Sequence, residues 1–185
     1  MPTRKVFLDA NVIIEAFRIG VWAELSQGHW LETVQKCEQE ALTGENSRAG
    51  RVSVDPKQLR AGLKASHLVG RPERNQLVNN HRDCLSMDDG EKDLFAHLFV
   101  HASPLPPIIV MSTADKGAIV RAKDLGWLDN LISLEELLGS CGTSRSKMAT
   151  LAEAYTAHFS DRGRLFQADR GRRFSVIMDD QGARE

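Results

Sequence analysis

Two short apolar runs, each followed by an aspartate and then by a helix-like pattern, constrain the fold of this chain most. Val6-Phe7-Leu8 leads directly to Asp9, and the run 108–111 leads through a short turn to Asp115. Runs of this length without polar alternation are typical of strands buried on both faces, as in a parallel sheet. Because such strands alternate with helices, the sequence predicts an α/β fold with a mainly parallel central sheet.

Weaker signals place the other elements. Strands are predicted at 33–37 and 131–132, and helices at 12–18, 21–25, 38–42, 116–125 and 134–138. Asp55-Pro56 is a helix-start signal, after which Leu59, Leu63 and Leu68 supply an apolar stripe. The most periodic helix follows Asp88, carries apolar residues at 94, 95, 98 and 99, and ends before 104–107.

These elements predict one main domain with two additions. The expected domain covers residues 1–140 and includes a helical insertion at about 44–84. Residues 141–185 form a predicted C-terminal extension, with a helix-like stretch at 151–159 followed by an Arg-rich stretch. A chain of 185 residues is long enough to bury a core without disulfides or a structural metal.

Charge is divided unevenly along the chain. The formal net charge is -1, which excludes a protein that coats nucleic acid by bulk charge alone. Residues 144–174, however, hold seven Lys or Arg against three Asp or Glu, a local charge of +4. The arginines of this tail either contact phosphates, remain solvated or form a self-association surface; they are Arg162, Arg164, Arg170, Arg172 and Arg173.

The three cysteines and the hydropathy pattern bear on location. Cys37, Cys84 and Cys141 are widely spaced and form no CxxC pair, so a disulfide framework is not expected. Asp9 and Glu15 interrupt the N-terminal apolar runs, which argues against a signal peptide, and no run is long enough to span a membrane. We therefore expect a cytoplasmic protein.

The acids that follow the strands have two readings. Either aspartate could cap the helix after it, because Asp is a preferred N-cap. Alternatively, Asp9 and Asp115 meet at the carboxyl edge of the sheet, where ligands bind in open α/β folds. Two carboxylates about 5 Å apart repel by roughly 3 kcal/mol at an effective dielectric near 20, so such a pair favours a hard divalent cation, Mg²⁺ or Mn²⁺.

Three segments, in this order, resemble the PIN domain. They are KVFLDANVIIEAF, GEKDLFAHL and IIVMSTADKGAIVRAKDLG, and the resemblance covers about 5–42 and 87–138. PIN domains are metal-dependent nucleases and include toxins of toxin–antitoxin pairs. The resemblance therefore implies a three-layer, Rossmann-like α/β/α fold and a Mg²⁺- or Mn²⁺-dependent endoribonuclease that leaves a 5′-phosphate and a 3′-hydroxyl.

Matching each motif to this chain gives four expected catalytic acids. Asp9 is the first and Asp115 the last. Glu40, with Glu38 as its rival, is the expected acid of the helix after the second strand. In GEKD, Asp93 is preferred to Glu91 because Leu-Phe-Ala follows it. Asp9, Asp93 and Asp115 are the expected metal ligands, whereas Glu40 would complete the site or position water.

Alternatives stay open for two neighbours of these acids. Glu91 could form a capping box with Asp88 or act as an auxiliary acid. Asn11 could be a turn residue or could orient Asp9. His97 and His101 have the i, i+4 spacing of zinc ligands, but Leu98 replaces the glutamate of HExxH, which favours structural or surface histidines.

The sequence thus predicts an RNA-hydrolysing enzyme, with an RNA substrate and no membrane. An antitoxin partner and a homodimer are implied by the resemblance only. The competing hypothesis is a non-catalytic PIN-like module that binds RNA or a protein.

Overall fold

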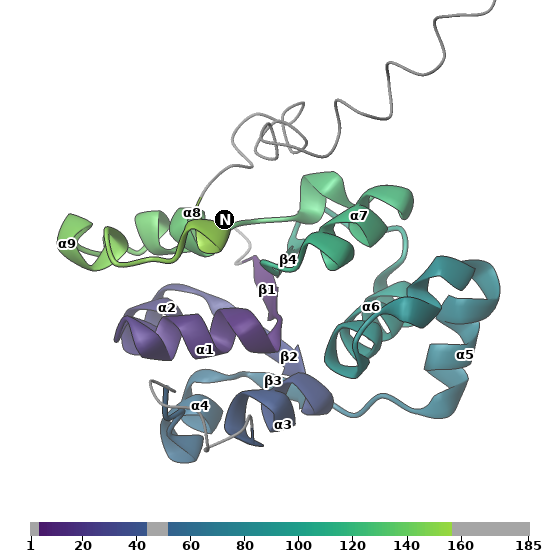
Figure 1. Ribbon diagram of the computed structural model, residues 1–185, viewed down its shortest axis with the longest axis horizontal. Helices are drawn as coiled ribbons and strands as arrows, with labels where there is room; N and C mark the ends of the chain where they lie inside the picture. Colours follow the sequence, from purple (N-terminus) through teal and green to yellow (C-terminus); the bar gives the residue numbers. More distant parts are fainter. Residues whose placement is uncertain (1–3, 44–51, 157–185) are drawn as a thin grey trace, which may run out of the picture.

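Four parallel strands form the centre of the molecule. A computed structural model describes residues 4–43 and 52–156. The strand order is β3-β2-β1-β4, so β1 lies between β2 and β4 (Figure 1). The strands are β1 (Lys5–Leu8), β2 (Trp30–Val34), β3 (Ala65–His67) and β4 (Ile109–Ser112). The fold is therefore α/β with a parallel sheet, as predicted.

Helices connect the strands and cover the sheet. They are α1 (Ala10–Arg18), α2 (Trp22–Gly28), α3 (Gln35–Thr43), α4 (Pro56–Gly62), α5 (Arg71–Asn80), α6 (Asp89–Ala102), α7 (Lys116–Asp124), α8 (Leu134–Ser140) and α9 (Arg145–Met148), with 3₁₀ turns at η1 (Arg82–Ser86), η2 (Leu128–Asn130) and η3 (Glu153–Tyr155). In Figure 1, α1 and α2 lie on one side of the strands, and α5 and α6 lie on the other.

Alternating side chains of the strands enter two hydrophobic clusters. Val6 and Leu8 of β1 belong to one cluster, in which α1, α2 and α8 pack, whereas Phe7 belongs to the other. The second cluster includes Phe95 of α6 and Leu77 of α5. Because successive residues of a strand point to opposite faces, one sheet separates two helical layers. This arrangement is compatible with the expected three layers.

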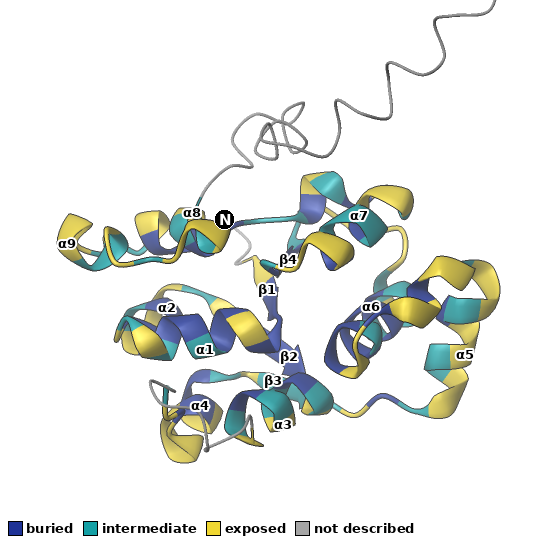
Figure 2. Ribbon diagram, viewed as in Figure 1, coloured by how far each residue is buried: buried dark blue, intermediate teal, exposed yellow. Residues whose placement is uncertain are grey.

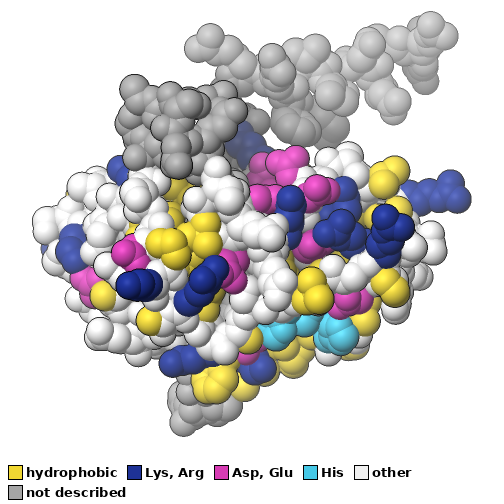
Figure 3. Space-filling model, turned by 90° about the horizontal axis from the view of Figure 1, so that it is seen from below, with side chains coloured by type: hydrophobic (Ala, Val, Ile, Leu, Met, Phe, Trp, Pro, Cys, Tyr) yellow, Lys and Arg dark blue, Asp and Glu magenta, His cyan; other side chains and the backbone are white. Residues whose placement is uncertain are grey.

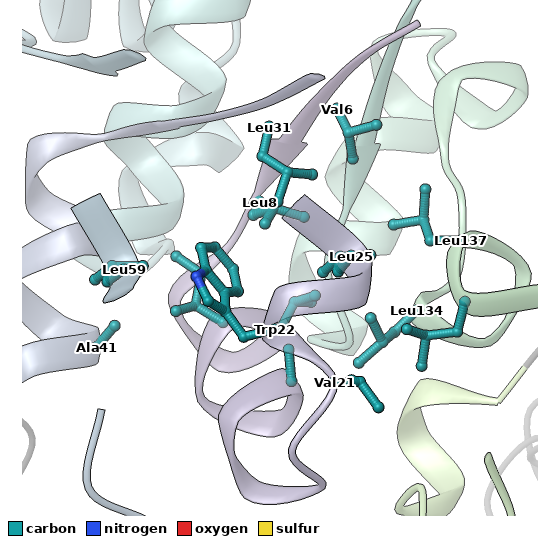
Figure 4. Close-up of a cluster of buried hydrophobic side chains, with 14 of the residues drawn as sticks. Val6, Leu8, Val21, Trp22, Leu25, Leu31, Ala41, Leu59, Leu134 and Leu137 are labelled. Carbon is teal, nitrogen blue, oxygen red and sulfur yellow. The ribbon is translucent and has the colours of Figure 1, made fainter. Parts of the chain in front are cut away.

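The first cluster holds the N-terminal helices against the sheet (Figure 4). Trp22 and Leu25 of α2 point toward Leu8 and Leu31, and Leu134 of α8 closes the opposite side. Figure 2 shows the strands and the inward faces of these helices as buried, while the outward faces are exposed. Burial on both faces explains why the strands read as continuous apolar runs.

Several helix boundaries follow the predicted capping signals. The Asp55 carboxylate accepts hydrogen bonds from the backbone N–H groups of Lys57 and Gln58, both at 2.8 Å. Ser133 and Glu136 form a capping box at the start of α8. Gly126 ends the helix 116–124 with a φ of 74°, a conformation that favours glycine. These predictions are confirmed.

The second strand and the insertion differ from the prediction. The strand lies at Trp30–Val34 rather than at 33–37. It can include the charged residue Glu32 because the carboxylate has partners in the sheet, Lys5 at 3.2 Å and His67 at 2.8 Å. The segment 52–84 is not purely helical, since β3 pairs with β2 as an edge strand. The helix α4 ends at Gly62, before this strand. Leu68 was expected in the apolar stripe of a helix, but it lies beyond α4 and is 75% exposed.

The described start of the C-terminal extension packs on the body of the domain. Met148, Leu151 and Tyr155 contact the first cluster, and the Tyr155 hydroxyl donates to the backbone oxygen of Asn11 at 3.2 Å. The expected helix at 151–159 is a 3₁₀ turn at Glu153–Tyr155 within the described part. The Arg-rich stretch 162–173 lies outside the described residues.

Two further expectations concern cysteines and membranes. All three cysteines are free, and Cys37 and Cys84 are buried. Within residues 4–43 and 52–156, no helix has the length and apolarity needed to cross a membrane.

Candidate metal centre

Asp9 lies at the carboxyl end of the central strand β1. Its side chain is buried and only 2% of the residue is exposed. Oδ1 accepts a hydrogen bond from the Ala10 N–H at 2.6 Å, and Oδ2 accepts one from the Thr113 hydroxyl at 3.0 Å. Asp9 therefore caps α1, which confirms the capping reading, and its carboxylate is also held by the segment after β4.

Asp115 follows β4, the neighbour of β1, and is exposed. Its Oδ1 accepts a hydrogen bond from the Ala118 N–H at 2.9 Å, so it is the N-cap of α7. The backbone N–H of Asp115 is held by the Thr113 hydroxyl at 3.2 Å. Thr113 thus contacts both aspartates, and the turn between β4 and α7 fixes their relative positions.

Glu40 reaches the same region from α3. Its Oε1 accepts a hydrogen bond from the backbone N–H of Gly90 at 3.1 Å, in the first turn of α6. A Cβ built at Gly90 would lie 2.1 Å from Oε2 of Glu40. Because a side chain at position 90 would collide with the carboxylate, glycine permits the close approach of α3 and α6.

Glu91 is the acid that lies between the others. It is 8% exposed and lines two neighbouring pockets, one that also includes Asp9 and Glu40 and one that includes Asp115. Burial and, to a smaller extent, the negative charges of Asp9 and Asp115 together raise the pKa of Glu91 to about 8. Asp88 is the N-cap residue of α6 but makes no side-chain capping bond within the described residues, so the capping-box reading of Glu91 is wrong.

The two pockets together form a hollow that we call the acidic hollow. The larger has a volume of about 530 Å³ and the smaller about 270 Å³. Both are lined by Met87, Asp88 and Glu91. Asn11, whose orienting role was left open, also lines the larger pocket, and its side chain is exposed.

Asp93 does not line the acidic hollow, contrary to the sequence-based preference. It is 3% exposed and forms a two-pronged ion pair with Arg74 of α5, with Nη2 and Oδ2 2.7 Å apart. Residues 91 and 93 are two positions apart on α6, so they point to nearly opposite sides of the helix. The motif match preferred Asp93 because of the residues that follow it, and those residues do not determine which face of α6 meets α3.

Glu38 likewise has a partner elsewhere. Its Oε1 accepts a hydrogen bond from Arg60 Nε at 2.8 Å. Of the two rivals on α3, Glu40 is therefore the one that lines the acidic hollow.

Burial and mutual repulsion disfavour full ionisation of this cluster. Burial, with smaller contributions from the charges of Glu40 and Asp115, raises the pKa of Asp9 to about 6, although the hydrogen bonds from Thr113 and Ala10 oppose the shift. Burial also raises the pKa of Glu40, although Lys36 opposes the shift. Lys36 Nζ lies 3.9 Å from Glu40 Oε1 and 3.9 Å from Asp89 Oδ2. Arg121 also lines the smaller pocket, but its Nη1 lies 2.8 Å from Asp124 and 3.5 Å from Asp83. The acids that line the two pockets outnumber these cations, which favours a bound cation.

The carboxylate groups of the described acids line different parts of the acidic hollow and do not converge on one point. Within the described residues, the one group in which three candidate ligand atoms lie within 4.8 Å of one another is Glu73, His97 and His101, outside this hollow. An ion in the acidic hollow would therefore need water molecules as additional ligands. Mg²⁺ normally keeps several waters and takes one or two carboxylates.

Comparisons with models of protein families, with curated proteins and with solved structures found no match.

Sequence reasoning missed two features of this region. Thr113 was treated as a turn residue, although its hydroxyl joins the two aspartates. Glu91 was ranked below Asp93; the helical period, applied to the apolar residues 94, 95 and 98, would have placed the two acids on different sides. No sequence signal identifies Gly90 as a contact of Glu40.

Proposed function

We propose that the chain is a Mg²⁺- or Mn²⁺-dependent endoribonuclease of the PIN type, with its metal centre in the acidic hollow. The observation that supports it most is the position of four acids from separate segments at the carboxyl edge of one parallel sheet. They are Asp9, Glu40, Glu91 and Asp115. Relative to the sequence-based set, Glu91 takes the place of Asp93.

The ligand chemistry of the acidic hollow fits a hard cation. All four acids offer carboxylate oxygens, which suit Mg²⁺ and Mn²⁺ better than softer ions. The larger pocket has a volume of about 530 Å³, which leaves room for a hydrated ion and for part of a substrate. The raised pKa values of Asp9 and Glu91 indicate that the site gains free energy when a cation offsets their charge.

The four acids would have different roles. A bound divalent ion would supply activation of water and charge stabilisation at a phosphodiester. Asp9 would be one metal ligand, and the Ala10 N–H and the Thr113 hydroxyl fix its orientation. Asp115, which follows the neighbouring strand β4, would be a second ligand. Glu40, held by the Gly90 N–H, would orient water, and Glu91 would hold or release a proton at its carboxyl group.

A cleavage assay tests the proposal. Structured and unstructured RNA would be incubated with the full chain, with Mn²⁺ or with a chelator, and the product ends identified. We expect cleavage only with the metal, leaving a 5′-phosphate and a 3′-hydroxyl, and none with Asp9→Asn or Asp115→Asn. Equal cleavage by both variants and the wild type would refute the metal centre.

A non-catalytic module is the second candidate, because the acids do not converge within 4.8 Å in the described structure. RNA or protein binding would then use the same edge of the sheet. Metal-independent RNA binding without cleavage would favour this alternative. An antitoxin partner and a homodimer remain proposals of the same family resemblance, and co-purification and sedimentation would test them.

A further inference from the structure

A second cluster of ligand side chains lies on α6, beyond the acidic hollow along the same helix. One candidate ligand atom each of Glu73, His97 and His101 lies within 4.8 Å of the other two. His101 Nε2 and Glu73 Oε1 are 2.9 Å apart. Figure 3 shows the histidine side chains gathered in one patch on this face of the molecule, beside acidic and hydrophobic side chains. We call the three residues the histidine cluster.

The backbone presents these side chains on two packed helices. His97 and His101 are four residues apart on α6, so they lie on the same side of the helix, one turn apart. Glu73 is in the first turn of α5, which packs against α6. Its Oε2 accepts a hydrogen bond from the Gly70 N–H at 2.7 Å, which leaves Oε1 directed at His101. A backbone donor of this kind fixes the orientation of a ligating carboxylate.

The His97 ring carries a buried nitrogen, Nδ1. Among the described residues, its Nδ1 is buried and has no hydrogen-bond partner. The ring stacks on His67, with ring centres 4.1 Å apart, and lies 4.8 Å from the ring of His101. A buried polar atom without a partner costs free energy, so the stack is poorly explained as packing alone.

We propose that Glu73, His97 and His101 form a site for a divalent transition-metal ion of the Zn²⁺ type, separate from the acidic hollow. In a tetrahedral zinc site with ligands at about 2.1 Å, two ligand atoms lie about 3.4 Å apart. Glu73 Oε1 and His101 Nε2, in contact at 2.9 Å, would separate slightly, and side-chain rotation would bring the His97 ligand atom, within 4.8 Å of the other two, closer to them. Imidazole selects such ions over Mg²⁺, and three protein ligands leave a position for water. The ion would join α5 to α6.

Binding of Zn²⁺, and of Co²⁺ as a coloured probe, tests the site in the full chain. To remove the acidic hollow as a competitor, the titration is done on an Asp9→Asn, Asp115→Asn background. We expect one tightly bound ion, a visible Co²⁺ spectrum of the four-coordinate type, and a higher melting temperature with Zn²⁺. On the same background, His101→Ala and Glu73→Gln should each weaken binding by at least about tenfold.

His29→Gln is the matched control, because His29 is half-buried and contacts Leu137 and Ser140 far from the cluster. It should bind Zn²⁺ like the parent. His101 is exposed, so its loss should leave the fold intact, and circular dichroism checks this. If His101→Ala and Glu73→Gln bind as tightly as the parent, or if His29→Gln loses the ion as they do, the proposal is wrong. Because this site does not depend on RNA cleavage, its failure would leave the proposed nuclease unaffected.

Discussion

The two ends of α6 carry clusters of ionisable side chains with different chemistry. At its first turn, Glu91 belongs to the acidic hollow, in which every candidate ligand is a carboxylate. Later along the helix, His97 and His101 meet Glu73 of α5. The acidic hollow is wide and suits a hydrated hard ion, whereas the histidine cluster is narrow and suits an ion of the zinc type. One helix thus contributes to two proposed metal sites, which Mg²⁺ and Zn²⁺ should distinguish.

Asp93 lies between these clusters and belongs to neither. Its ion pair with Arg74 fixes α5 against α6 near the histidine cluster. The comparison therefore assigns three roles to three acids of neighbouring elements: Glu91 faces the acidic hollow, Asp93 pairs across the helix interface, and Glu73 faces the histidines. The following predictions test this division.

The largest effect is expected from Asp9→Asn. Loss of a buried ligand at the end of β1 should lower Mn²⁺-dependent RNA cleavage by about 100-fold or more, since a metal contributes several kcal/mol of charge stabilisation. Zn²⁺ binding at the histidine cluster should be unchanged. Initial rates with Mn²⁺ and a Zn²⁺ titration on the same preparation measure both; parallel loss of cleavage and Zn²⁺ binding would show that the sites are not separate.

Asp93→Asn and Glu91→Gln should differ in their effects on stability and on cleavage. Asp93→Asn leaves Arg74, whose side chain is 35% exposed, without its charged partner, and should lower the free energy of unfolding by about 2 kcal/mol. Cleavage per folded molecule should persist. Glu91→Gln should lower cleavage, by less than Asp9→Asn does, without that loss of stability. Urea unfolding in chelator measures the stability of both variants, and single-turnover assays measure their cleavage. If folded Asp93→Asn no longer cleaves RNA, Asp93 again becomes a candidate metal ligand.

The pH dependence of stability gives a separate measure of Glu91 in the metal-free chain. Its folded-state pKa of about 8 lies above the ordinary value of 4.5, so the folded chain binds this proton more tightly than the unfolded chain. The resulting stability is complete below pH 4.5 and is lost as the pH rises to about 8. The free energy of unfolding in chelator, from urea titrations, should therefore fall across this range by less in Glu91→Gln than in the wild type, with a difference on the order of a few kcal/mol. Identical slopes would contradict the buried position of Glu91.

Sequence reasoning recovered the parts of this structure that depend on local patterns. The strand ahead of Asp9, the strand at 109–112 and the cap at Asp55 all follow from apolar runs or capping residues. The edge strand Ala65–His67 could not be found in this way, because it is three residues long and its stabilising partner is β2. Glu32 is similar: a charge inside a strand is tolerated only because Lys5 and His67 face it.

The sequence predicts where the candidate site lies in the fold, but not which of the neighbouring acids line it. Asp9 and Asp115 follow adjacent strands, and the order of a parallel sheet brings such residues together. The choice between Glu91 and Asp93 depends on how α6 is rotated against α3 and α5, which tertiary contacts decide. The histidine cluster had a visible i, i+4 signal, but its third member, Glu73, lies on another helix, and no short motif contains it.

The smallest effect is expected from Gly90→Ala. The new methyl group would lie 2.1 Å from Glu40 Oε2, so the carboxylate must move away from the Gly90 N–H. Alanine is otherwise favourable in a helix, by about 1 kcal/mol over glycine, so stability should change little. Cleavage should fall by about tenfold, because Glu40 would no longer be held at the acidic hollow. Gly139→Ala is the control, since a Cβ at position 139 meets no atom within 4 Å. Equal rates for Gly90→Ala and Gly139→Ala, measured with Mn²⁺ at one RNA concentration, would show that the position of Glu40 does not matter.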